Sequence, residues 1–99
     1  MNKTEAEYEQ HLKTLLHAGA ITWYCFEGYK FRLADNTFYS PDFAVMLPGG
    51  MLEMHEVKGY WLDDARAKIK VAASLFPHPF VAVMRRKKKD GGGWAEERF

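Results

Sequence analysis

Two acids and one lysine have the types and the spacing that could support chemistry. Asp42 follows Pro41, and Glu56 and Lys58 come after a Pro-Gly-Gly turn. Side chains alternate between the two faces of a strand, so Glu56 and Lys58 are predicted to share a face, with Val57 on the opposite one. A hairpin across the turn would bring Asp42 beside them. Two carboxylates and one amine are therefore expected to converge.

This grouping is typical of phosphodiester hydrolysis with a divalent cation. Converging carboxylates repel each other and need a cation, and hard oxygen ligands select Mg²⁺, with Mn²⁺ as a substitute, over zinc. A metal held by Asp42 and Glu56 could polarise a phosphate oxygen and lower the pKa of a water. Lys58 could orient that water or stabilise the developing charge. The alternative is an ordinary strand with a charged end, because Glu-x-Lys alone is common.

A helix is predicted over residues 4–18, ahead of these strands. Thr4 and Glu7 fit a capping box at its start. Its apolar stripe consists of Tyr8, Leu12, Leu15 and Leu16. Glu5 and Glu9 lie on or beside this stripe, which is unusual because burying an unpartnered charge is costly. The alternative for Glu5 is a frayed helix start that leaves it in water.

The remaining pattern predicts an α/β fold. Strands are expected over residues 21–33 (as one strand or two), 37–47, 51–60, 80–84 and 94–99, the last at an edge. Pro41 within the 37–47 segment suggests an edge, a bulge or a late strand start. A second helix is predicted over 62–76, and a strand that follows it can return parallel to the strand before it. The order is α-β-β-β-α-β, a mixed sheet flanked by helices. Residues 1–99 are expected to form a single domain.

Composition narrows the class of protein. The chain is 47% hydrophobic and 15% aromatic, which predicts a folded protein. No apolar stretch is long enough to cross a membrane, and the charged first residues lack an apolar signal core. The single cysteine, Cys25, cannot form an internal disulfide. A cytoplasmic location is therefore expected.

Basic residues supply the candidates for DNA contact. The net charge of +1 is too small to predict nucleic-acid binding, but five consecutive basic residues span 85–89. That run is either a solvated tail or an arm that contacts phosphates. The predicted DNA-binding residues are Arg66, Lys68, Lys70, Arg85, Arg86 and Lys87. Tyr60 and Trp61 could stack on unpaired bases or serve the core. The histidines show no zinc spacing, and His55 is predicted to be structural or at the surface.

The pattern PD-x₁₃-E-V-K resembles the signature of the PD-(D/E)XK nuclease superfamily. Pro41-Asp42 matches the PD, and Glu56-Val57-Lys58 matches the E-x-K. The resemblance implies a restriction-endonuclease-like α-β-β-β-α-β core, in which the Asp and the Glu bind the metal and the Lys assists the attacking water. Many members similar to phage junction-cleaving endonucleases carry a further metal-binding Glu on the first helix. Glu5 is the natural match, and Glu9 is the reserve.

Nearly the whole chain also resembles small phage and prophage proteins that share a domain of unknown function (DUF1064). The matching stretches are NKTEAEY, FRLADNTFYSPDFAVMLPGG, LEMHEVKGYWLDDARAKIKVAA and DGGGW. Together the resemblances imply a Mg²⁺-dependent DNA endonuclease that acts on branched or junction DNA in a bacterial host cell. A homodimer is the expected assembly, because it would place two sites on two strands. The alternative is a non-catalytic DNA- or protein-binding module on a nuclease fold.

Overall fold

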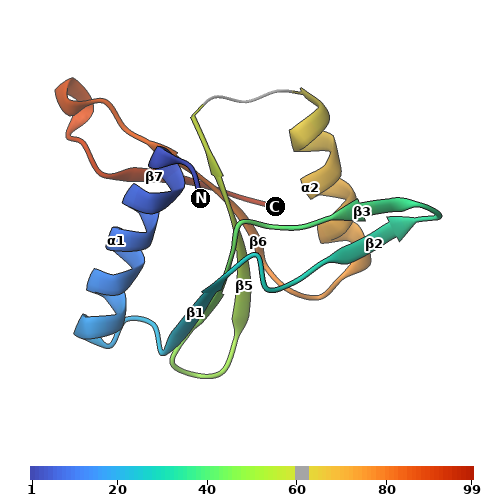
Figure 1. Cartoon of the computed structure of the whole chain (residues 1–99), viewed down its shortest axis with the longest axis horizontal. Helices are drawn as coiled ribbons and strands as arrows, with labels where there is room; N and C mark the ends of the chain where they lie inside the picture. The colour runs from blue at the N-terminus through green and yellow to red at the C-terminus, as the bar shows by residue number, and fades with distance from the viewer. Residues whose placement is uncertain (60–62) are drawn as a thin grey trace.

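A five-stranded mixed sheet crosses the middle of the molecule (Figure 1). The computed structural model describes residues 1–59 and 63–99, so the roles predicted for Tyr60, Trp61 and Leu62 lie outside the described residues. The strand order is β1-β4-β5-β6-β7. The strands are β1 (Trp23–Phe26), β4 (Phe43–Met46), β5 (Leu52–Lys58), β6 (Phe80–Arg85) and β7 (Trp94–Arg98). Only the β5–β6 pair is parallel among these neighbours.

One helix covers each face of the sheet (Figure 1). Helix α1 (Lys3–Ala18) precedes β1, and helix α2 (Asp63–Leu75) forms the crossover between the parallel strands β5 and β6. On the α1 side the buried core comprises Tyr8, Leu12, Ile21, Phe43, Val45, Val57, Val81 and Val83. On the α2 side it comprises Phe31, Tyr39, Ala44, Met54, Ile69, Ala72, Phe80 and Ala82. Alternate residues of one strand enter different cores because strand side chains alternate. The predicted mixed α/β class with flanking helices is confirmed.

A separate hairpin, β2 (Phe31–Ala34) with β3 (Thr37–Tyr39), lies between β1 and β4 in the sequence. The single strand predicted over 37–47 is therefore wrong. Pro41 cannot donate a ladder hydrogen bond, and β4 begins only after it, at Phe43. The segment 21–33 forms two strands, and Glu27 between them has a positive φ of 51°. The hairpin packs on α2, where the rings of Phe31 and Phe76 have centroids 4.8 Å apart.

Helix α1 begins one residue earlier than predicted and uses a different cap. The Asn2 side chain accepts a hydrogen bond from the Glu5 backbone N–H at 2.8 Å, and the Glu5 carboxylate accepts one from the Asn2 N–H at 2.7 Å. The capping box predicted for Thr4 and Glu7 is thus wrong. Asn2 and Glu5 have the same spacing and also satisfy the pattern. This cap fixes the position of the Glu5 carboxylate.

The ends of four elements meet at one end of the molecule (Figure 1). The carboxyl-terminal ends of β5 and β6 lie near the amino-terminal ends of α1 and α2. The predicted strands over 80–84 and 94–99 are confirmed as β6 and the edge strand β7. Within the described ranges, neither helix has the length and apolar character needed to cross a membrane.

Candidate active site

Asp42 and Glu56 meet across neighbouring antiparallel strands. The register pairs Phe43 with His55, so the next position outward places Asp42 opposite Glu56. The Val57 backbone N–H donates a hydrogen bond to Asp42 Oδ2 at 2.8 Å. This bond holds the Asp42 carboxylate against β5. Asp42 itself lies directly before the first residue of β4. The convergence predicted from the Pro-Asp and Glu-x-Lys spacing is present.

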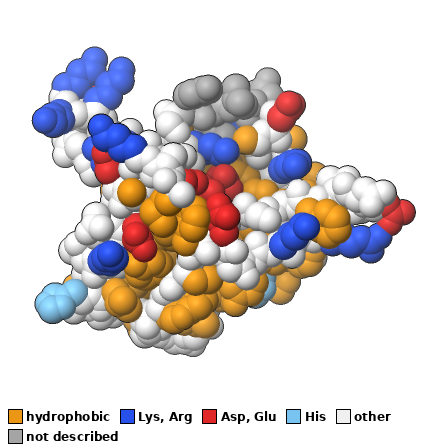
Figure 2. Space-filling model, in the orientation of Figure 1, with side chains coloured by type: hydrophobic (Ala, Val, Ile, Leu, Met, Phe, Trp, Pro, Cys, Tyr) orange, Lys and Arg blue, Asp and Glu red, His pale blue; other side chains and the backbone are white. Residues whose placement is uncertain are grey.

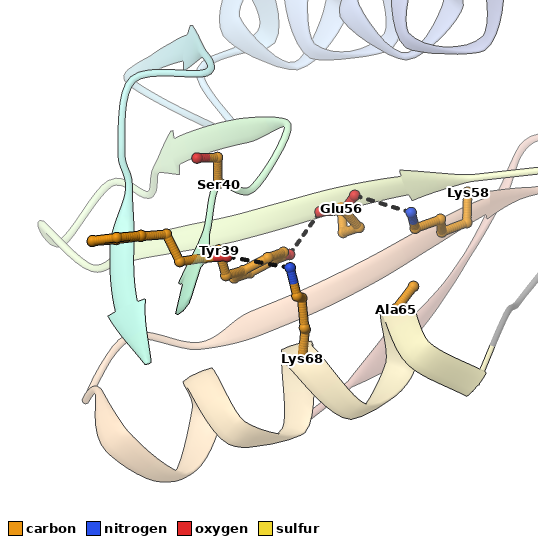
Figure 3. A pocket seen from close by; sticks show the side chains of 7 residues that line it. Tyr39, Ser40, Glu56, Lys58, Ala65 and Lys68 are labelled. Atoms are coloured by element: carbon orange, nitrogen blue, oxygen red, sulfur yellow. Dashed lines mark hydrogen bonds and ion pairs between the residues drawn. The ribbon is translucent and has the colours of Figure 1, made fainter. Parts of the chain in front are cut away.

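Glu56 is held by two side chains, one on each oxygen. The Tyr39 hydroxyl donates to Glu56 Oε1 at 2.7 Å, and Lys58 Nζ lies 3.3 Å from Glu56 Oε2 (Figure 3). Glu56 is only 7% exposed, so its charge depends on these partners rather than on water. Lys58 and Glu56 share one face of β5, as the alternation predicted, while Val57 enters the α1-side core.

The two β5 residues face a pocket of about 240 Å³ (Figure 3). Its walls come from the β2–β3 hairpin and the chain after it, from β5, and from α2. The lining residues are Phe38, Tyr39, Ser40, Glu56, Lys58, Ala65 and Lys68. Lys68 Nζ donates to the Phe38 carbonyl oxygen at 3.4 Å, which joins α2 to the hairpin across the pocket. Two lysines and one carboxylate therefore border a single opening.

Burial and mutual repulsion of Asp42 and Glu56 disfavour the ionised form of Asp42. Burial and the neighbouring Glu56 charge raise the pKa of Asp42 from 3.8 to about 8, against the lowering effect of the Val57 N–H; Glu5 raises it further. Burial is also the main reason that the pKa of Tyr39 is raised, and the Glu56 charge adds to it, so Tyr39 stays a protonated donor. Figure 2 shows acidic side chains near the centre of one face, with basic side chains on either side.

Of the two helix acids, Glu5 is the one that interacts with Asp42. It raises the Asp42 pKa through a side-chain hydrogen bond and through charge repulsion. Glu9 instead accepts a hydrogen bond from the Tyr24 hydroxyl at 3.0 Å. Within residues 1–59 and 63–99, no group of three or more His, Cys, Asp or Glu side chains is arranged to hold a metal ion. Glu5 Oε1 accepts the Asn2 N–H of the α1 capping box, so this carboxylate would join a ligand set through its other oxygen.

The Asp42–Glu56 pair nevertheless has the donor chemistry of a hard-cation site. Its donors are carboxylate oxygens, and burial together with the neighbouring Glu56 charge disfavours the ionised form of Asp42. Mg²⁺ is commonly bound through one or two carboxylates, with its other positions filled by water and phosphate oxygens. The pair therefore fits such an ion, and Glu5 remains the predicted third ligand.

The predicted DNA-binding residues lie in different places. On α2, Arg66 pairs with Glu97 of β7, Lys68 lines the pocket, and Lys70 is exposed. The other three, Arg85, Arg86 and Lys87, line a separate groove beside the start of α1. Only Lys68 therefore borders the pocket that holds Glu56 and Lys58.

Tyr39 is a site residue that the sequence analysis missed. It precedes Pro41 by two residues, and its contact with Glu56 depends on how the hairpin folds onto α2. His55, by contrast, is buried on the opposite face of β5. It contacts the Tyr8 hydroxyl at 2.7 Å and Glu53 at 3.0 Å, as a structural residue would.

Comparisons with protein-family models, curated proteins and solved structures found no match to this chain. By its fold, the described chain is a mixed α/β protein with two helices, a five-stranded sheet and an added hairpin. Its distinguishing feature is the acidic pair with an adjacent lysine at one end of the sheet. The family resemblances remain predictions.

Proposed function

We propose that this protein is a Mg²⁺-dependent endonuclease that hydrolyses phosphodiester bonds in DNA. The observation that carries the proposal is the meeting of Asp42 and Glu56 on adjacent strands, with Lys58 Nζ 3.3 Å from Glu56. A divalent cation bound there would polarise a phosphate oxygen and make a water a better nucleophile. Mn²⁺ is expected to substitute for Mg²⁺ because both prefer oxygen ligands.

Other groups of the chain would position the two carboxylates and stabilise the charge that develops on the phosphate. Val57 N–H and the Tyr39 hydroxyl hold the Asp42 and Glu56 carboxylates in place. Lys58 can bind a phosphate oxygen and stabilise the charge that grows as water adds to phosphorus. The water loses a proton, the leaving oxygen gains one, and the strand is left with a phosphate monoester at one end and a hydroxyl at the other.

The topology supports a nuclease fold. Omitting the hairpin, the order is α1-β1-β4-β5-α2-β6, with antiparallel pairing up to β5 and parallel pairing of β5 with β6. This is the α-β-β-β-α-β order that the resemblance to PD-(D/E)XK nucleases implies. The hairpin and β7 are then additions to that core. Selectivity for branched or junction DNA, in phage or prophage DNA processing, is proposed on the resemblance to junction-cleaving endonucleases.

Cleavage assays test the proposal directly. Supercoiled plasmid and a four-way junction are incubated with the protein in Mg²⁺, Mn²⁺, Ca²⁺ or EDTA. We expect cutting with the first two, and a loss of at least about 100-fold in rate for Asp42→Asn and for Lys58→Ala. Asp35→Asn in the hairpin turn and Lys13→Ala on α1 are matched controls, because both positions are exposed. The controls should cut at the rate of the unmodified protein.

Two results would count against this assignment. Full activity in Asp42→Asn or Lys58→Ala would remove the proposed roles of these residues. DNA that is bound but not cut with any of the metals would favour the alternative, a non-catalytic DNA-binding module on the same fold. Circular dichroism of each variant separates lost chemistry from lost folding.

A further inference from the structure

A second concave surface, which we name the basic groove, adjoins the candidate site. It has a volume of about 540 Å³ and is lined by Lys3, Thr4, Glu7, Gly59, Arg85, Arg86, Lys87 and Lys88. Gly59 directly follows Lys58, and Thr4 directly precedes Glu5. Consecutive residues at the end of β5 therefore line the pocket and the groove, although the two hollows share no lining residue. Five of its lining residues are cationic and one is acidic, which leaves a formal charge of +4.

Two arginines build the wall of the basic groove. Arg85 forms an ion pair with Glu7 of α1, and its guanidinium lies 5.1 Å from the centroid of the Trp94 ring. Arg86 donates a hydrogen bond to the Asp90 carbonyl oxygen. These contacts tie the end of β6 to α1 and to the chain that follows. Arg85 and Arg86 are therefore held by contacts with the fold, although the whole run from 85 to 89 is exposed.

The loop after β6 is folded as well. The Arg86 backbone N–H donates to the Gly93 carbonyl at 2.9 Å and closes the loop. A short 3₁₀ helix (Lys88–Asp90) ends at Gly91, whose φ of 100° favours glycine. The lysines of the groove are thus carried on a defined surface.

Three lysines of the groove have no compensating charge. Within the part of the chain that the structure describes, no ion pair and no side-chain hydrogen bond involves Lys3, Lys87 or Lys88. Like charges held close together repel and do not stabilise the fold. Such a cluster in a concave surface attracts an anion that carries several charges.

We propose that the basic groove binds the phosphodiester backbone of the DNA strand next to the phosphate that is cut. The choice of DNA rests on the proposed function. Lysine ammonium groups contact phosphates without reading bases, and they provide affinity and register. The groove and the pocket suited to phosphodiesters lie at the same end of β5, where Gly59 lines one and Lys58 lines the other, and this favours a nucleic-acid strand over an acidic protein segment. A DNA strand in the groove would pass the end of β5, where Gly59 follows Lys58.

A charge-matched pair of variants tests the groove. Lys87→Gln with Lys88→Gln removes two lining cations, whereas Lys13→Gln with Lys30→Gln removes two exposed cations that lie outside both the groove and the basic run. Binding of a fluorescent four-way junction and of a single strand is measured by anisotropy in EDTA, so that no cutting occurs. We expect the first variant to bind about tenfold more weakly and the control to stay within about twofold. The slope of log K against log salt should fall by about 1.5 in the first variant alone.

The melting temperature serves as the structural readout. The groove variant should melt no lower than the unmodified protein, because no ion pair or side-chain hydrogen bond of the described residues involves Lys87 or Lys88. Equal losses of binding in both variants would show a general charge effect and overturn the groove. Displacement of DNA by polyglutamate as readily as by unlabelled DNA would also overturn it.

The two proposals fail in different ways. If DNA is cut normally by the Lys87→Gln, Lys88→Gln variant and bound as tightly as by the control, the groove is refuted while the endonuclease stands. If binding depends on these lysines but no metal supports cutting, the endonuclease is refuted while the groove stands.

Discussion

Asp42 occupies a position that the metal-free fold does not favour. Burial and the adjacent Glu56 charge raise the pKa of Asp42, so ionising it in the folded chain costs free energy. The unfolded chain releases this proton near pH 3.8, while the folded chain keeps it until about pH 8. Stability from this group is therefore complete below pH 3.8 and is lost as the pH rises between these values.

Asp42→Asn should remove this pH dependence. The amide keeps an oxygen that can accept the Val57 N–H, but it carries no charge. In EDTA at pH 8 we expect the variant to be more stable by at least about 1 kcal/mol, or roughly 4–8 °C in melting temperature. The difference should shrink towards pH 4. Mg²⁺ should raise the melting temperature of the unmodified protein and not that of the variant.

The melting temperatures of the unmodified protein and of Asp42→Asn are measured across a pH series, and their difference is taken at each pH. Other titrating groups then cancel. A melting temperature for Asp42→Asn that is lower at every pH would mean that the carboxylate stabilises the fold, and the proposed metal role would lose its energetic support.

Tyr39→Phe should impair the site without unfolding it. The hydroxyl that orients Glu56 Oε1 is lost, while the ring continues to fill the α2-side core. Groups that position metal ligands typically contribute 10- to 100-fold in metal affinity or activity. We therefore expect the Mg²⁺ concentration for half-maximal cleavage to rise by about tenfold or more. Tyr29→Phe, at an exposed position in the segment before β2, is the control, and an equal effect there would contradict the prediction.

At the level of elements, strand β5 carries two separate groups of polar side chains, one on each of its faces. Glu56 and Lys58 face the pocket on the α2 side, while Glu53 and His55 are buried on the α1 side. Burial raises the pKa of Glu53, but hydrogen bonds from Arg98 and His55 outweigh this effect and keep the pKa below its usual value. Burial lowers the pKa of His55, against the raising effect of Glu53, so the ring is neutral at pH 7. Because the Glu53 carboxylate only accepts, His55 donates through Nε2 and accepts from Tyr8 through Nδ1.

Tyr8→Phe should therefore affect stability and not cleavage. The substitution leaves His55 Nδ1 buried without its donor, and we expect a loss of about 1–2 kcal/mol in the free energy of unfolding. Urea denaturation measures it, with Tyr24→Phe, a partly exposed tyrosine, as a control that costs less. Cleavage should stay within about twofold of the unmodified rate. A large loss of cleavage at unchanged stability would show that the two faces of β5 are coupled.

The elements were predictable where one local signal dominated. Apolar periodicity located both helices, and the Pro-Gly-Gly turn set the β4–β5 hairpin that brings Asp42 to Glu56. The late start of β4 after Pro41 was among the predicted alternatives, but the separate hairpin was not, because aromatic residues continue on both sides of Pro41. The two overlapping capping patterns at the start of α1 were equally good locally, and only packing of the helix selects between them.

The candidate site was predictable only in its central residues. Asp42, Glu56 and Lys58 follow from strand alternation and one turn, which are local rules. Tyr39 reaches Glu56 from a different sheet, so its contact depends on tertiary packing of the hairpin against α2. The basic run likewise could not be placed, because its position depends on the Arg85–Glu7 pair between β6 and α1.

At the scale of the whole molecule, the net charge is small, but basic and acidic side chains gather in different places. The net charge is only +1, yet the basic groove collects five cations at one end of the molecule, beside the acidic pair. Attraction of a polyanion is therefore local and is weakened by salt. The chain measures 40 × 31 × 22 Å, and its described residues hold one such acidic pair. If the proposed chemistry holds, a single copy would cut one strand at a time.

Cutting both strands of a duplex in one binding event requires two copies. The two strands run in opposite directions, so a two-fold symmetric homodimer would present one centre to each. We expect sedimentation with a four-way junction to show two copies per DNA, and a cruciform plasmid to be converted to linear product with little nicked circle. Equal amounts of unmodified protein and Asp42→Asn should then yield nicked circles, because mixed dimers have one working centre. A single copy at every concentration, with and without DNA, would make the homodimer prediction wrong while the chemistry proposed for each centre would stand.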